Sequence, residues 1–181
     1  MLIAQQKRKE NIAEYVLYMW QIEDQIRAFK FDLDLIEEQI INQYQVDDET
    51  KAQIRQWYSD IIQMMEIERI QKQGHLQVVK NIVIDMHDLH LRLLKLPAEI
   101  KYKELFFKAL PHIQKLEEKM NGERLNETDT CLHGLYGVLL LRISNKKVSK
   151  ETDEAVKTFS QAMAYLAKKY SEREKDPEKF I

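Results

Sequence analysis

Residues 131–143 decide the fold, and they read CLHGLYGVLLLRI. Only His133 and Arg142 are strongly polar in this stretch, so a helix built from it is apolar nearly all round and must be surrounded by other helices. Residues 75–94 are similar, because their polar positions fall on one narrow arc of a helix. We therefore predict an all-α, single-domain bundle in which residues of about 75–94 and about 128–144 form two central apolar helices.

Glycine and proline are scarce in this chain of 181 residues, which has four glycines and three prolines. Hairpin turns, dinucleotide-binding loops, phosphate-binding loops and nucleophile elbows need glycine where φ is positive or where a ligand touches the backbone. The sequence therefore excludes these sites, and no catalytic residues are expected.

The spacing of apolar residues predicts about six or seven helices. The expected ranges are 9–29, 32–44, 48–73, 75–94, 102–120, 128–144 and 149–171. The side chains expected to cap helix starts are those of Asp32, Asp47 or Asp48, Asn126 or Thr128, and Ser149. No linker or repeat divides the chain, so we assign 1–171 to one domain and 172–181 to a charged, frayed tail.

Charge and cysteine content favour a cytoplasmic protein. The formal net charge is -2, so no global field attracts a nucleic acid. The most apolar stretch is too short for a bilayer, which needs about 20 residues. Cys131 is the single cysteine, so it forms no internal disulfide, as expected in a reducing cytosol. We therefore predict no nucleic-acid or membrane partner.

Two charged residues fall on apolar helix faces, where burial without a partner is costly. Glu23 lies between Met19 and Ile26, and Arg142 lies in line with Leu139. An ion pair between Glu23 and Arg142 is the simplest way to satisfy both. The local alternative pairs Glu23 with Arg27 and lets Arg142 reach the bundle end. A ligand-anchoring role for both is the further alternative.

His87 and His90 are spaced i, i+3, which brings two imidazoles within reach of one ion. A metal would need more ligands from other helices, and no histidine here follows a glutamate by three residues, as helical di-iron sites require. We therefore interpret His90 as a hydrogen-bonded core histidine and His87 as a boundary residue. No metal and no cofactor are predicted.

Aromatic residues cover more than one face of the first predicted helix. Leu17 and Tyr18 point away from the stripe of Ile12, Met19 and Ile26. Such apolar area usually has a partner. Leu17 and Tyr18 are therefore the predicted interface, and a protein partner or a homo-oligomer is expected.

Gly134 and Gly137 lie one turn apart in the central helix 128–144. Each costs about 1 kcal/mol in helix propensity relative to alanine. That cost is tolerable if a neighbouring backbone or a ligand comes close there.

The opening 24 residues, MLIAQQKRKENIAEYVLYMWQIED, and the segment Cys131 to Arg142 resemble a family of uncharacterised all-helical proteins from gut-type, Bacteroides-like bacteria. That family is known only as a domain of unknown function. The resemblance implies a bacterial, cytosolic, all-helical protein and supplies no activity and no catalytic residues.

Two functions remain open from the sequence. The leading hypothesis is a non-enzymatic helical module that acts through protein contacts, self-association included. The alternative is a small-molecule-binding or catalytic bundle with a pocket lined by Glu23, Trp20, His90 and Arg142. These four residues and His87 are the candidate ligand-binding or buried polar cluster. Several hundred Å³ of cavity with these groups converging would favour the alternative.

Overall fold

The computed structural model describes residues 2–119, 125–176 and 178. These residues form eight α-helices and one 3-10 helix and no strand, so the predicted all-α class is confirmed. The helices are α1 (Leu2–Glu10), α2 (Ile12–Ala28), α3 (Leu33–Gln39), η1 (Ile41–Gln43), α4 (Asp48–Ile67), α5 (Gln77–Lys95), α6 (Ile100–Lys119), α7 (Glu127–Ile143) and α8 (Lys150–Lys175). Met120, at the predicted end of the fifth helix, lies outside the described residues. None of the described helices has the length and apolarity that crossing a bilayer requires.

Polar side chains start four of these helices. Asp32, Asp47, Asn126 and Ser149 precede α3, α4, α7 and α8, and each accepts a hydrogen bond of 2.7–3.2 Å from the backbone N–H three residues on. These bonds satisfy N–H groups that the first turn of a helix leaves without partners. The predicted capping residues are thus confirmed.

Four predicted boundaries are wrong, and the first is the end of the helix expected over 48–73, which stops at Ile67. The helix expected over 9–29 is two helices, because Asn11 interrupts it and its side chain accepts a hydrogen bond of 3.1 Å from Ala13 N–H. The helix expected over 32–44 ends at Gln39 and continues only as the 3-10 turn η1. The tail expected from 172 is helical as far as Lys175, and Arg173 within it forms an ion pair of 2.6 Å with Asp85.

The chain divides into two compact units. The first comprises residues up to Arg8 together with Glu14–Asn81, and the second comprises Lys9–Ala13 together with the residues from Ile82 onward. Helices α1, α2 and α5 contribute residues to each unit. The assignment of 1–171 to one domain stays a prediction.

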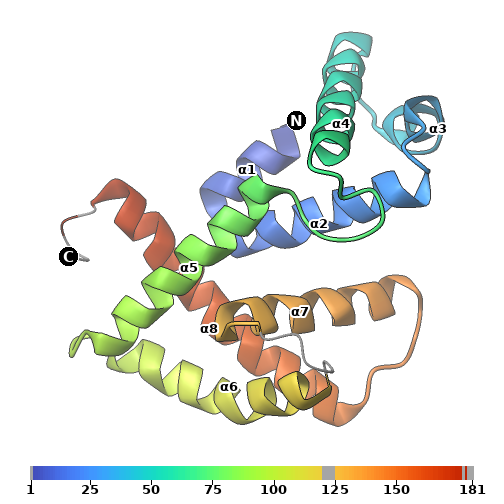
Figure 1. Ribbon diagram of the computed structural model, residues 1–181. Coiled ribbons are helices and arrows are strands. Elements are labelled where there is room, and N and C mark those ends of the chain that lie inside the picture. The colour runs from blue at the N-terminus through green and yellow to red at the C-terminus, as the bar shows by residue number, and fades with distance from the viewer. Residues whose placement is uncertain (1, 120–124, 177, 179–181) are drawn as a thin grey trace. The chain divides into compact units, whose positions relative to one another are not determined.

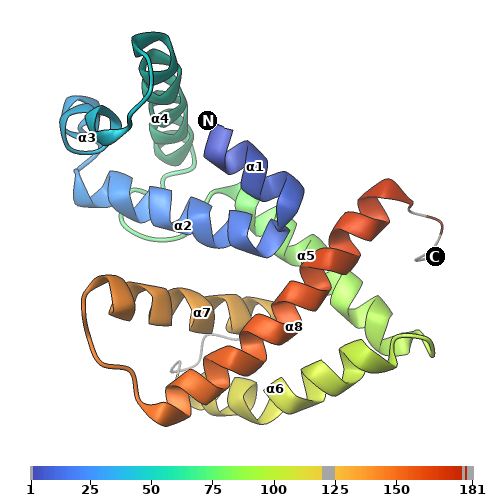
Figure 2. The same ribbon diagram turned by 180° about the vertical axis from the view of Figure 1, so that it is seen from behind.

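Within the first unit, η1 packs on α3, and both contact α4 (Figure 1). Fully buried Ile36, Ile41 and Tyr58 lie in these three elements. Within the second unit, α8 packs along α6 and α7, as the two opposite views show (Figures 1 and 2). Leu132 and Leu166 are fully buried there.

The two helices expected to be central carry much of the buried surface. On α5, Met86, Leu89 and Leu93 are completely buried. Most of the first three turns of α7 is buried or half-buried, whereas Leu140 and Ile143 near its end are 38% and 56% exposed. The apolar end of α7 thus leaves part of its surface open to solvent.

Candidate functional site

Gly134 and Gly137 have opposite surroundings on α7. A Cβ atom built on Gly134 would lie 2.7 Å from Cε2 of Phe159 on α8 and 3.0 Å from Cδ2 of Leu116 on α6. Glycine at 134 therefore permits close packing of the three helices. A Cβ atom on Gly137 would meet nothing within 4 Å. Packing does not require glycine at 137, and the space beside it is open.

That open space belongs to a pocket of about 270 Å³ between α6, α7 and α8. Its apolar lining comes from Leu116, Val138, Leu141, Val156 and Phe159, and its polar lining from His112, Lys115, Lys119, His133, Glu151 and Thr152. All of these residues belong to the second unit. The pocket thus combines an apolar interior with several groups that are or can become cationic.

The lining of the pocket contains one carboxylate, that of Glu151. Lys115 forms an ion pair with Glu151, which raises the pKa of Lys115. The hydrogen bond and charge of Lys115 lower the pKa of Glu151, and Lys119 and His112 lower it further. Glu151 therefore stays ionised, and two lysines and one histidine surround its single negative charge. Among the lining residues two lysines face one carboxylate, while just outside the lining Glu118 lies near Lys115 and Asp129 pairs with His133 at 3.2 Å.

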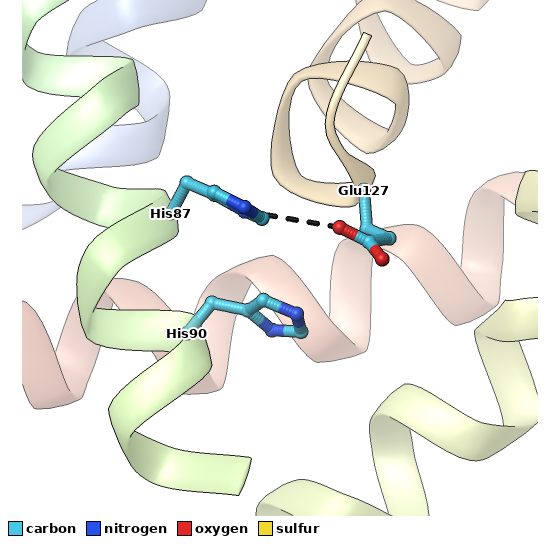
Figure 3. A group of neighbouring side chains, drawn as sticks. All are labelled: His87, His90 and Glu127. Atoms are coloured by element: carbon cyan, nitrogen blue, oxygen red, sulfur yellow. Dashed lines mark ion pairs between the residues drawn. The ribbon is translucent and has the colours of Figure 1, made fainter.

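A second polar cluster joins α5 to the start of α7 (Figure 3). Each of His87, His90 and Glu127 offers a nitrogen or oxygen atom, and these three atoms lie within 4.8 Å of one another. The imidazole rings of His87 and His90 stack at 5.4 Å. Nδ1 of His87 lies 3.9 Å from Oε2 of Glu127 and 3.4 Å from Oγ1 of Thr128.

The structure places His90 in the core and His87 at the boundary, as the sequence interpretation expected. His90 is 1% exposed, and its Nδ1 lies 2.7 Å from the hydroxyl of Tyr102, which is completely buried. Burial lowers the pKa of His90 to about 4, with a smaller contribution from His87. His90 is therefore neutral at neutral pH.

The expected ion pair between Glu23 and Arg142 is wrong. Glu23 is completely buried, and its carboxylate lies 2.6 Å from Nδ1 of His75 and accepts a hydrogen bond of 3.0 Å from Leu76 N–H. Arg142 is 59% exposed and pairs with Asp153 at 2.9 Å. The position of Arg142 near the end of α7 leaves its side chain in solvent, where an acidic residue of α8 reaches it.

The local alternative for Glu23 is also wrong. Arg27 pairs with Asp24 at 2.8 Å and donates to the carbonyl oxygens of Ile70 and Gly74. The remaining candidate, Trp20, stacks on the imidazole of His75 at 4.4 Å. Trp20 and Glu23 thus share His75 as a neighbour within the first unit.

The chain matches a known protein family over nearly its whole length. A family model described as "Domain of unknown function (DUF4924)" matches residues 1–177. The chain belongs to the DUF4924 family. No curated protein and no solved structure matches the chain. The family description supplies no activity, so functional inference for this DUF4924 domain rests on its own residues.

The predicted interface of the DUF4924 domain is less exposed than the sequence suggested. Leu17 and Tyr18 are both half-buried. Burial raises the pKa of the Tyr18 hydroxyl, with a contribution from Tyr44. The expectation that both side chains point freely into solvent is therefore wrong, because part of each is buried.

Sequence reasoning missed several residues of these sites in the DUF4924 domain. Glu127 lies 40 positions after its neighbour His87, and His75 lies 52 positions after its partner Glu23. No local spacing signals either pairing. The lysines of the pocket look like ordinary solvated residues of an amphipathic helix. The two glycines were the one usable signal, since their cost in helix propensity pointed to α7.

Proposed function

We propose that this protein binds a small molecule, with a compact apolar body and an anionic group, in the pocket between α6, α7 and α8. The observation that carries the proposal is Gly137. A glycine in mid-helix costs about 1 kcal/mol relative to alanine, and nothing within 4 Å would obstruct a Cβ atom there. A bound molecule explains why the wall at this position carries no side chain.

The size of the pocket limits the occupant. Its volume is about 270 Å³, just below the roughly 300–1,000 Å³ typical of sites for drug-sized ligands. The lining residues Leu116, Val138 and Phe159 favour an aliphatic or aromatic body. A nucleotide or a peptide is too large and too polar for this space.

The polar lining favours an anion. Lys115 and Lys119 outnumber Glu151, the single carboxylate of the lining. An anionic group gains charge-assisted hydrogen bonds from such donors. The apolar body would then extend past Gly137.

Calorimetric titration with octanoate tests this proposal. We expect one octanoate per chain with a Kd of about 1 mM or tighter. Gly137→Leu should abolish binding, because the new side chain fills the pocket, while Gly137→Ala, which adds one methyl group, should retain it within several-fold. Circular dichroism establishes that both variants are folded. Absence of binding, or unchanged binding by a folded Gly137→Leu variant, contradicts the proposal.

The anionic part of the proposal has its own test. Glu151→Gln removes a negative charge and releases Lys115, so it should strengthen octanoate binding several-fold. Octan-1-ol has the same chain without the charge, and its affinity should not change. An equal effect on both ligands would show that charge plays no part in recognition.

Protein contact, the leading hypothesis from the sequence, is the second candidate, with a second copy of this chain as the partner. Ile100 and Phe107 are 64% and 60% exposed and lie two turns apart on one face of α6. Light scattering coupled to size exclusion should report a mass above 21.7 kDa, and Phe107→Glu should lower it. A monomer at high micromolar concentration would remove this candidate.

A bacterial cytoplasmic origin is part of the same proposal. It is supported by the resemblance to proteins of Bacteroides-like bacteria and by a single cysteine, Cys131, which is buried. Fractionation of cells that express the natural gene, with detection by an antibody against the protein, tests the location.

A further inference from the structure

We propose that His87, His90 and Glu127 bind one divalent transition-metal ion, with zinc as the representative. Two imidazole nitrogens and one carboxylate oxygen form a donor set that zinc accepts in proteins, and a fourth position is left for water or another ligand. This site lies apart from the pocket lining, with which it shares no residue. It is therefore independent of the proposed function.

Metal binding would require the three donor atoms to move only slightly closer together. The three donor atoms lie within 4.8 Å of one another, and ligands about 2.1 Å from a tetrahedral zinc are roughly 3.4 Å apart. The side chains of His87 and Glu127 are 19% and 40% exposed, so their torsions have room to adjust. Figure 3 shows both imidazoles extending from α5 toward the carboxylate at the start of α7.

His90 supplies the observation that points to a ligand. Its Nε2 is buried and has no hydrogen-bond partner among the described residues. Leaving a buried polar atom without a partner is unfavourable. A metal ion beside Glu127 would satisfy this nitrogen, which no described protein group does.

Tyr102 provides the support that a metal-bound histidine usually has. When the Nδ1–H of His90 donates to the Tyr102 oxygen, 2.7 Å away, the lone pair of His90 lies on Nε2. Ligating histidines commonly use their second nitrogen in this way, which fixes the ring and the tautomer. Tyr102 is thus a positioning residue and His90 a ligand.

The rest of the described chain offers no equivalent site. Within residues 2–119, 125–176 and 178, this is the only group of three or more His, Cys, Asp or Glu side chains whose donor atoms lie this close. The sequence predicted no metal, because two histidines alone are too few ligands. Glu127 supplies the third, and only the fold brings it to α5.

Titration of chelator-treated, tag-free protein with zinc chloride tests the inference by calorimetry. We expect one ion per chain. His87→Gln and Glu127→Gln should each weaken zinc binding at least tenfold, in line with the loss of one ligand. His133→Gln is the matched control, since His133 lies outside the cluster and near another acidic residue, Asp129. The zinc affinity of this variant should equal that of the unaltered protein.

The visible absorption of cobalt(II) gives a signal that depends on metal coordination and that a purely structural role of these residues would not produce. A cobalt ion held by these residues should show the intense visible absorption of a four-coordinate site, and Glu127→Gln should reduce it. Absence of zinc binding, or unchanged zinc affinity in folded His87→Gln and Glu127→Gln variants, overturns the inference. Gly137→Leu should retain full zinc affinity, so failure of the pocket proposal and failure of this one are distinguishable.

Discussion

At the scale of residues, two glycines one turn apart give opposite predictions for the same substitution. Gly134→Ala places a methyl group against the buried ring of Phe159, and overpacking of this kind costs about 1–3 kcal/mol. Gly137→Ala meets open space and should stabilise the fold by up to about 1 kcal/mol through helix propensity. Urea unfolding of both variants measures whether each substitution raises or lowers the free energy of unfolding. Destabilisation by both, to the same extent, would contradict the assigned surroundings.

A second prediction at this scale concerns pH. The pKa of His90 is lowered from 6.5 in the unfolded chain to about 4 in the folded one, so protonation favours unfolding. The contribution of His90 to the free energy of unfolding is fully present above pH 6.5. As the pH falls toward 4, this free energy decreases by up to about 3 kcal/mol. Urea unfolding at several pH values, with a chelator present, measures this loss.

His90→Gln is the control for the pH prediction. Glutamine has an amide that can still contact Tyr102, and it does not titrate. The difference in unfolding free energy between the two proteins should therefore shrink as the pH falls through this window. If the difference in unfolding free energy did not depend on pH, His90 would have the same pKa in the folded and unfolded states, which would contradict the prediction.

At the scale of elements, the carboxylate of Glu23 on α2 contacts Leu76 N–H and His75, which directly precede α5. Glu23→Ala leaves buried donors without an acceptor and should cost about 3 kcal/mol. Arg142→Ala removes an exposed ion pair between α7 and α8 and should cost under about 1 kcal/mol. Equal effects in urea unfolding would mean that the two charged residues share one environment.

Helices and caps were predictable because their causes are local. Apolar periodicity located the long helices, and Asp32, Asp47 and Ser149 started three of them as expected. The break at Asn11 was not predictable, because the apolar stripe continues across it and asparagine is tolerated within helices. The partners of Glu23 and His87 come from distant segments, so only the folded chain reveals them.

At the scale of the whole molecule, the two compact units share continuous helices, since α1, α2 and α5 each have residues in both. Unfolding one unit would therefore fray a helix of the other. We predict one cooperative thermal transition, with equal calorimetric and van't Hoff enthalpies. Two resolved transitions in differential scanning calorimetry would show that the single-domain assignment from the sequence is wrong.

The central claim is that the pocket beside Gly137 holds the apolar body of an anionic ligand. The most direct measurement is an isotope-filtered NOESY spectrum of the labelled protein with unlabelled octanoate. We predict cross-peaks between the octanoate chain and side-chain protons of Val138, Leu141 and Phe159, which line the pocket. Cross-peaks confined to residues outside the pocket, or none from a saturated sample, would contradict the claim.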